Sequence, residues 1–171
     1  MTLIVEDGSI VANANSYVSL VDARAYALAR QFVLPVGDVI LEAYLIQAMD
    51  YLESKRFEYQ GSKVDPALQT LQWPRQKVKI DCQIDFFPID KIPLELKQAQ
   101  SRLAVELTAG TVLFPTKPAS FVVREKIGPI ETEYSEKIGI FSQQVILSVD
   151  ALLLPLFSAC GSKFALYSIR V

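Results

Sequence analysis

Histidine is absent from the 171 residues of this sequence. Its absence excludes Ser–His–Asp and Cys–His catalysis, zinc sites with histidine ligands, and the side chain that most often titrates near neutral pH. An enzyme would have to rely on carboxylates, lysine, tyrosine or serine, and no constellation of these residues supports a hydrolase. We therefore expect a protein that is not an enzyme and that needs no metal and no cofactor.

Cysteine is scarce as well, since Cys82 and Cys160 are the only two. They are far apart in the sequence and form no Cys-x-x-Cys motif, so they give little support to a disulfide framework. We expect two reduced thiols in a cytoplasmic protein.

Long hydrophobic runs are missing too. The most apolar stretch, residues 145–160, is interrupted by Asp150 and Pro155 and falls short of the roughly 20 residues that cross a bilayer. The first residues lack the basic and apolar regions of a signal peptide. The sequence predicts a buried helix over the apolar stretch and no contact with a membrane.

Positive charge is not in excess, because 17 Lys and Arg residues stand against 19 Asp and Glu residues. A protein whose main task is to grip nucleic acid is usually basic, since it must neutralise phosphates. Apolar material, by contrast, is plentiful: hydrophobic residues make up 51% of the chain. That amount fits the core of a single domain over residues 1–171.

Capping and periodicity signals predict a mainly helical chain. Ser19, with Asp22 three residues later, predicts the start of the first helix. Asp38 is expected to cap the second helix, and Asp65 a short one that begins with Pro66. Apart from the last helix, the expected helices cover residues 20–31, 39–56, 66–71 and 93–109.

Apolar residues cover most of the circumference of the helix over residues 39–56, which predicts a helix largely enclosed by protein. Asp50 and Glu53 lie on this helix without a partner cluster. Solvent or a subunit contact explains these two carboxylates better than catalysis does.

The two later helices have clear signals of their own. An apolar stripe runs along the helix over residues 93–109, with Arg102 and Glu106 placed to pair on the opposite face. The last helix should be capped by Ser148 or Asp150 and kinked or split at Pro155. The members of the stripe are Leu96, Ala99, Leu103 and Leu107.

A β-hairpin is predicted between these two helices, and its register follows from the sequence. Gly128-Pro129 suits a two-residue type II′ turn, because glycine supplies the positive φ that the first position needs. One register then places both basic residues opposite acidic ones and keeps the apolar pairs on the other face. The expected pairs are Ile127 with Ile130, Lys126 with Glu131, and Arg124 with Glu133.

Together these signals predict a mainly α (α+β) fold. We expect a helical bundle with a projecting hairpin at about residues 119–136 and an extended C-terminal segment at about residues 162–171.

One stretch of the sequence favours nucleic acid. Basic residues and the aromatic residues Phe57, Tyr59 and Trp73 alternate between residues 55 and 79, as they do in single-strand binding surfaces. The alternative is that the rings belong to the core and the charges to a solvated or intersubunit surface. The candidate nucleic-acid contacts are Lys55, Arg56, Arg75, Lys77 and Lys79.

Six motifs follow one another along nearly the whole chain: Val5-Glu6-Asp7-Gly8, Ala12-Asn13-Ala14-Asn15-Ser16-Tyr17, Asp50-Tyr51-Leu52-Glu53, Gln72-Trp73-Pro74-Arg75, Ile92-Pro93 and Arg124-Glu125-Lys126-Ile127-Gly128-Pro129. In this order and approximate spacing they resemble a family of tailed-bacteriophage proteins. That family is described both as head-to-tail connector (adaptor, head completion) proteins and as DnaT-like single-stranded DNA-binding proteins. Residues 80–90 depart from its pattern, being longer and more acidic, so contacts made by that loop are not carried over.

The connector description implies a ring of about twelve copies, in which two different faces of each subunit complement each other. The ring would contact the portal protein and a tail-proximal connector or tail terminator protein. Genomic double-stranded DNA would pass through it without sequence-specific contact, as the low net charge allows. The protein would reside in the neck of the virion, and in the host cytoplasm during assembly.

Two segments are expected to make the contacts of such a ring. The hairpin would reach a neighbouring subunit, through Arg124, Lys126, Ile127, Gly128, Pro129, Ile130, Glu131 and Glu133. The C-terminal segment would dock on the portal or a neighbour, through Phe164, Leu166, Tyr167, Ile169, Arg170 and Val171. The other description implies single-stranded DNA binding through the basic and aromatic stretch.

Overall fold

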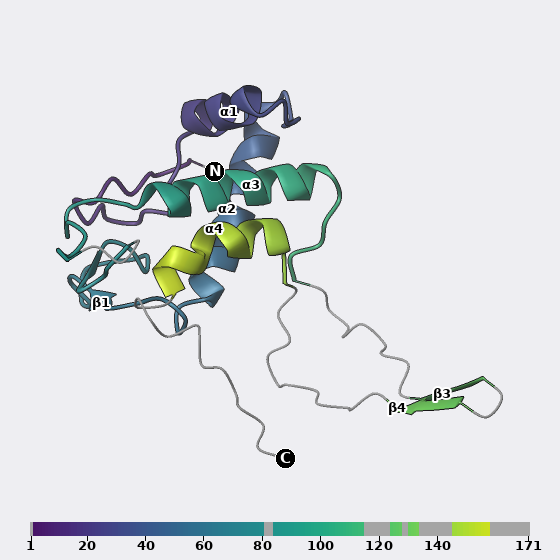
Figure 1. The fold of residues 1–171 in the computed structure, drawn as a ribbon. Helices are drawn as coiled ribbons and strands as arrows, with labels where there is room; N and C mark the ends of the chain where they lie inside the picture. Colours follow the sequence, from purple (N-terminus) through teal and green to yellow (C-terminus); the bar gives the residue numbers. More distant parts are fainter. Residues whose placement is uncertain (1, 81–83, 115–123, 128–129, 134–144, 158–171) are drawn as a thin grey trace, which may run out of the picture.

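A computed structural model of the chain describes residues 2–80, 84–114, 124–127, 130–133 and 145–157. Within these residues it has four helices and two small antiparallel sheets (Figure 1). This confirms the mainly α fold with a hairpin. The helices are α1 (Leu20–Ala29), α2 (Asp38–Ser54), α3 (Leu94–Thr108) and α4 (Leu147–Phe157). The strands are β1 (Ser62–Lys63), β2 (Arg75–Gln76), β3 (Arg124–Ile127) and β4 (Ile130–Glu133).

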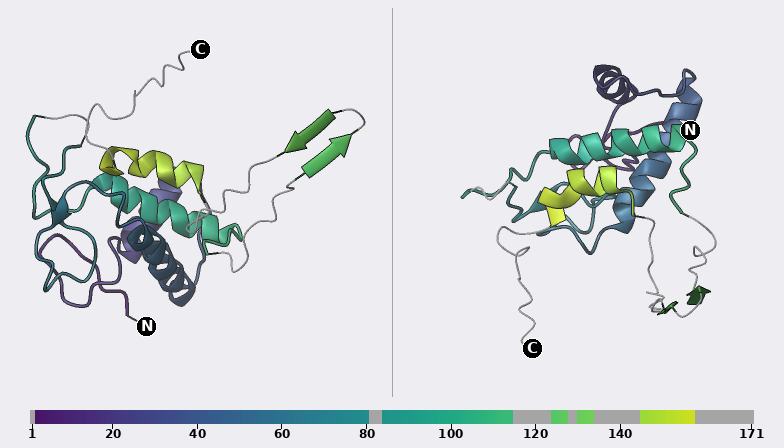
Figure 2. Two further views of the ribbon diagram at one scale, coloured as in Figure 1. Left: turned by 90° about the horizontal axis from the view of Figure 1, so that it is seen from below. Right: turned by 45° about the vertical axis from the view of Figure 1, so that its right-hand side comes forward.

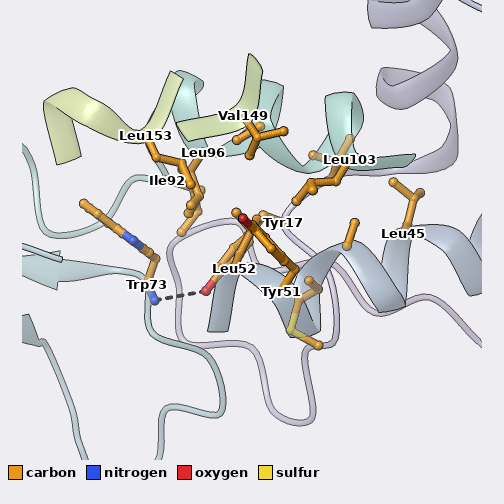
Figure 3. Close-up of a cluster of buried hydrophobic side chains, with 14 of the residues drawn as sticks. Tyr17, Leu45, Tyr51, Leu52, Trp73, Ile92, Leu96, Leu103, Val149 and Leu153 are labelled. Atoms are coloured by element: carbon orange, nitrogen blue, oxygen red, sulfur yellow. Dashed lines mark hydrogen bonds between the residues drawn. The ribbon is translucent and has the colours of Figure 1, made fainter. Parts of the chain in front are cut away.

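Helix α3 is the centre of the helical body, because it packs against α1, α2 and α4. Helices α3 and α4 lie side by side, and α2 crosses them on one side (Figures 1 and 2). The apolar stripe predicted for α3 is confirmed, since Leu96, Ala99 and Leu103 are fully buried. They meet Leu52 of α2 and Leu153 of α4 in the core shown in Figure 3.

The ends of the first and third helices agree with their sequence signals. The Ser19 hydroxyl accepts a hydrogen bond from the Asp22 backbone N–H at 3.1 Å, as expected of an N-cap. The chain leaves α3 at Gly110, whose φ of +89° is one that glycine adopts without strain. The predicted ion pair of α3 is also present, with 2.8 Å between Arg102 and Glu106, although both side chains are partly buried beside Ser148 of α4.

The start of α2 differs from the prediction in two ways. Gly37 is the N-cap and Asp38 the first helical residue, because the Asp38 carboxylate is drawn into an ion pair with Arg24 at 2.7 Å. The first turn is also open to solvent, since Val39 and Ile40 are exposed. The prediction that protein encloses most of this helix is therefore wrong for its first turn. From Leu41 onward only one face of the helix is buried.

The predicted short helix over residues 66–71 is a single turn. Asp65 does cap that turn, because its carboxylate accepts from the backbone N–H groups of Ala67 and Leu68 at 3.0 and 3.2 Å. The Gln69 side-chain amide then donates to the backbone oxygens of Leu71 and Pro74. These bonds hold the following residues in an irregular path, and no helix forms.

The last helix begins before both predicted caps. Ser148 and Asp150 lie inside the first turn of α4, and their side chains bond to other helices instead. Ser148 donates to Glu106 at 3.2 Å, and Asp150 pairs with Lys55 at 3.1 Å. The helix is not split at Pro155, since it continues to Phe157.

A buried polar network joins the N-terminal segment to α2 and to the loop that carries Trp73. The Tyr17 hydroxyl donates to Glu53 Oε1 at 2.6 Å. It also accepts from the Trp73 backbone N–H at 3.2 Å (Figure 3). The Gln72 backbone N–H donates to the same Glu53 oxygen at 3.0 Å. The prediction that Glu53 serves only solvent or a subunit contact is therefore wrong.

The buried side-chain amide of Gln100 extends this network into α3. Gln100 is fully buried, and its side-chain oxygen accepts from the Tyr17 backbone N–H at 2.8 Å. Its Nε2 donates to the Ser16 hydroxyl and to the Leu45 backbone oxygen. Buried amides stabilise a fold when all their partners are present, so Gln100 fixes the N-terminal segment between α2 and α3.

The first of the motifs that carry the family resemblance, Val5-Glu6-Asp7-Gly8, also has a structural role. The buried Glu6 carboxylate accepts hydrogen bonds from the backbone N–H groups of Gly8, Ile10 and Val11. Gly8 has a φ of +114°, and a Cβ there would lie 2.1 Å from the Asp90 backbone oxygen. Glycine is therefore required at this close approach of the two segments.

Burial raises the pKa of Glu53, although the bonds from Tyr17 and Gln72 oppose the shift. A carboxyl whose pKa is raised on folding stabilises the fold most below its unfolded pKa, and this contribution is lost as the pH rises through the folded value. Glu53→Gln keeps a carbonyl oxygen for both donors and removes the charge. We expect the stability of Glu53→Gln relative to the parent protein to increase as the pH rises from 4 to 7.

Urea unfolding at several pH values measures this difference, with Glu42→Gln on the same helix as the control. Glu53→Ala removes the acceptor altogether and should cost about 1–3 kcal/mol at pH 7, because two buried donors lose their partner. Identical pH dependence of the Glu53→Gln and parent proteins would contradict the proposed burial effect.

Candidate nucleic-acid interface

The predicted nucleic-acid contacts divide into two groups in the structure. Lys55 and Arg75 are buried, whereas Arg56 and Lys77 are exposed and Lys79 is half-buried. Only the second group is placed to meet a ligand.

Arg75 is held inside by the chain itself. Its guanidinium donates to the backbone oxygens of Gln60 at 2.7 Å and Gly61 at 2.8 Å, and to the Gln72 side chain at 3.0 Å. Burial lowers the pKa of Arg75 from its ordinary value. Gly61 has a φ of +66°, and a Cβ there would lie 2.0 Å from the Gln76 backbone oxygen. Arg75 thus fixes a tight turn, and its donors are not available to phosphate.

Lys55 forms an ion pair with α4. Its ammonium lies 3.1 Å from Asp150 and 3.8 Å from Glu58, and it faces the rings of Tyr51 and Phe157. Burial alone would lower the pKa of Lys55, but Tyr51 and the two carboxylates outweigh it and the pKa is raised. Lys55 therefore remains charged as an internal link between α2 and α4.

Two of the three aromatic residues in the predicted stretch belong to the core. Tyr59 and Trp73 are buried, with ring centroids 5.8 Å apart in an edge-on arrangement. Trp73 also lies edge-on to Phe87 at 6.5 Å. For these two rings the alternative of a core role is correct. Phe57, by contrast, is 93% exposed.

The exposed basic and aromatic residues lie on three segments that hydrogen bonds hold together beyond the end of α2. The Gln60 side chain bonds to the backbone oxygen and N–H of Lys79 at 3.2 and 3.3 Å, which brings the turn after α2 to residues 77–79. The Phe87 N–H donates to Val78 at 2.8 Å and adds a third segment. We call the resulting surface the basic-aromatic end; it consists of Arg56, Phe57, Lys77, Lys79 and Phe86.

Each exposed ring of the basic-aromatic end has a cation near its face. The Arg56 guanidinium lies 5.8 Å from the centroid of Phe57, and the Lys79 ammonium lies 5.3 Å from that of Phe86. Phe86, which the sequence analysis did not single out, is 59% exposed. Exposed Glu58 and Asp85 lie nearby in the sequence, so the positive charge of this surface is modest.

The hairpin register predicted from the sequence is confirmed. Strands β3 and β4 pair antiparallel, with Arg124 opposite Glu133, Lys126 opposite Glu131 and Ile127 opposite Ile130. Among the described elements, the two strands contact only each other. Gly128 and Pro129 of the predicted turn lie outside the described residues.

The predicted docking segment also lies outside the described residues. It comprises Phe164, Leu166, Tyr167, Ile169, Arg170 and Val171. Their role as a portal or neighbour contact stays a prediction.

Other kinds of site find no support in the part of the chain that the structure describes. It contains no group of three or more acidic or cysteine side chains placed to hold a metal ion. None of its helices has the length and apolar character needed to span a membrane.

Comparison with known protein families gives a match over the whole chain. The model of the family described as "Putative DnaT-like ssDNA binding protein" matches residues 1–171. Neither the curated proteins nor the solved structures contain a match to the chain. The family description agrees with the single-stranded DNA interpretation of the sequence and does not mention a connector. Since the match extends over the whole chain, the protein belongs to this family.

Proposed function

We propose that this protein binds single-stranded DNA through the basic-aromatic end and catalyses no reaction. The observation that carries the proposal is the pair of exposed rings, Phe57 and Phe86, each with a cation within 6 Å of its face. Single-strand binding surfaces combine rings that stack on bases with cations that follow the backbone. The family description supports the same kind of ligand.

The arrangement predicts weak binding that tolerates different base sequences. Every base has a face that can stack on phenylalanine, so the rings select for unpaired bases and not for a sequence. Arg56, Lys77 and Lys79 supply three cations, whereas the whole chain has a net charge of −2. With three phosphate contacts, the logarithm of the affinity should fall with the logarithm of the salt concentration with a slope of about −2.

Fluorescence anisotropy with a labelled oligothymidine tests this proposal. Replacing one ring, in Phe57→Ala or Phe86→Ala, should weaken binding about 5- to 100-fold, because stacking contributes about 1–3 kcal/mol per base. Lys77→Ala should weaken binding less and reduce the salt dependence. Leu147→Ala, which changes an exposed apolar residue at the start of α4, is the matched control.

The double variant Phe57→Ala/Phe86→Ala provides the decisive comparison. If it binds oligothymidine as tightly as the parent protein, the basic-aromatic end is not the binding surface. Preference for a duplex of the same length would exclude stacking as the mode of recognition.

A second candidate function is the head-to-tail connector subunit that the motifs suggest. It is favoured by the β3–β4 hairpin, which contacts no other described helix or strand and has edges that a strand of a neighbour could extend. In this function about twelve copies would form a ring between portal and tail, and genomic double-stranded DNA would pass through it.

Electron microscopy of lysates separates the two functions. If the protein is a connector, a phage with a nonsense mutation in this gene should produce separate heads and free tails while its DNA replication continues. Complete virions in reduced number, together with lowered phage DNA synthesis, would exclude the connector and favour single-stranded DNA binding.

A further inference from the structure

We propose that the Gln60 side chain positions the basic-aromatic end, and that the docking of α4 controls through it the affinity for single-stranded DNA. The inference rests on the proposed function and concerns the same surface. Gln60 is half-buried and carries neither a charge nor a ring. It therefore acts as a positioning residue behind the surface and does not itself stack on a base or neutralise a phosphate.

The side-chain amide of Gln60 bonds to the backbone of Lys79 in both directions. Its oxygen accepts from the Lys79 N–H at 3.3 Å, and its Nε2 donates to the Lys79 carbonyl oxygen at 3.2 Å. Two bonds from one planar amide fix both the distance and the orientation of the backbone that they hold. The Phe87 N–H donates to the Val78 oxygen at 2.8 Å and ties the segment of Phe86 to the same place. The amide therefore determines where Lys79 and Phe86 lie relative to the turn after α2.

The same residue also bonds to the C-terminal end of α4. Gln60 Nε2 donates to the Pro155 backbone oxygen at 2.8 Å, and the Gln60 backbone N–H donates to the Leu156 oxygen at 3.0 Å. The last carbonyl groups of a helix have no partner within the helix, so Gln60 supplies two of the bonds that α4 lacks. A change in the position of α4 must move Gln60 or break these bonds.

The turn that displays the Phe57 ring rests on α4 as well. On one side of Phe57, the Lys55 ammonium pairs with Asp150 at 3.1 Å. On the other side, the rings of Tyr59 and Phe157 lie with their centroids 5.3 Å apart. Both halves of the basic-aromatic end therefore depend on α4, one half through these contacts and the other through the bonds of the side-chain amide.

Backbone strain makes the segment before Lys79 depend on its anchors. Lys77 has a φ of +61°, a left-handed conformation that is unfavourable for a residue with a Cβ and persists where the surrounding structure enforces it. On one side Gln76 pairs with Ser62 of β1, and on the other the Gln60 amide holds Lys79. We expect Lys77 to relax when the amide is removed, so that Lys77 and Lys79 leave their places in the surface.

A double-mutant cycle between Gln60 and Phe86 tests the positioning role, with the anisotropy of labelled oligothymidine as the readout. In the parent protein Phe86→Ala should weaken binding about 5- to 100-fold. Gln60→Ala should itself weaken binding about fivefold or more, and in that background Phe86→Ala should cost less than about twofold, because the ring no longer lies where the strand passes. The same cost of Phe86→Ala in both backgrounds would mean that Gln60 only stabilises the fold and would overturn the proposal.

Gln76→Ala is the matched control for this cycle. The Gln76 side-chain amide also donates to a backbone oxygen, that of Lys63 at 3.3 Å, and not to Lys79 or α4. This variant should leave the affinity for oligothymidine unchanged. Circular dichroism and urea unfolding of each variant show that the affinities compared are those of folded protein.

Gln60→Glu gives a readout that a purely structural role would not move. The introduced carboxylate still accepts from the Lys79 N–H, but it turns an oxygen in place of an N–H toward the carbonyl oxygens of Lys79 and Pro155. Binding should therefore weaken at pH 7 and recover, relative to the parent at the same pH, as the pH falls to 5 and protonation restores one donor. Gln76→Glu places the same charge in β2 and measures the electrostatic part. A recovery no larger than that of Gln76→Glu would contradict the role of the amide.

The control by α4 is tested by a change whose two possible effects have opposite signs. Asp150→Asn removes a negative charge, which by itself should strengthen the attraction for phosphate. If α4 controls the surface, the variant should bind oligothymidine more weakly, because Lys55 is left buried without its nearest carboxylate and α4 loosens. Asp85→Asn, which removes an exposed charge beside Phe86, is the control and should strengthen binding. Tighter binding by both variants would overturn the control by α4.

The same measurements separate this inference from the proposed function. If Phe57→Ala/Phe86→Ala binds oligothymidine as tightly as the parent protein, both are excluded. If that double variant loses binding while Gln60→Ala and Asp150→Asn bind like the parent, the proposed function stands and the control by Gln60 and α4 is excluded.

Discussion

The hydrogen bond between Tyr17 and Glu53 is the contact on which the rest of the structure depends. It joins the N-terminal segment to α2 inside the core, and the same Glu53 oxygen receives the backbone of the loop that carries Trp73. A buried carboxylate is costly unless its acceptors are filled. These two donors satisfy it only when three segments far apart in the sequence are in place, so local structure and tertiary structure form together.

This constraint determines which residues remain for function. Because the loop that carries Trp73 lies in the core, the Arg75 guanidinium reaches the backbone oxygens of Gln60 and Gly61. The ring of Tyr59 is buried against that of Trp73. The motifs that carry the family resemblance therefore build the core in large part. Phe57 and Phe86 stay exposed beside cations at the edge of this core, where we propose that single-stranded DNA binds.

Polar and apolar side chains are also placed unusually around α1 and the loop that follows it, away from the basic-aromatic end. The buried Gln100 side chain holds the N-terminal segment in place, and Arg24 holds the loop after α1. Three valines and Leu28 of α1 and this loop are exposed. The low net charge limits the attraction of the protein for phosphate, which agrees with the weak binding that we propose.

The sequence by itself determined the helices with periodic stripes, the Ser19 cap and the register of the β3–β4 hairpin, because these depend on neighbours within a few positions. Gln100 interrupts the apolar stripe of α3 between Leu96 and Leu103, so the sequence pattern marked it as a polar residue on the buried face. The pattern did not identify its hydrogen-bond partners. Only the tertiary structure decided that Lys55 and Arg75 are internal while Arg56 and Phe57 are exposed. The reason is that burial depends on segments distant in the sequence, which a pattern of residue types does not specify.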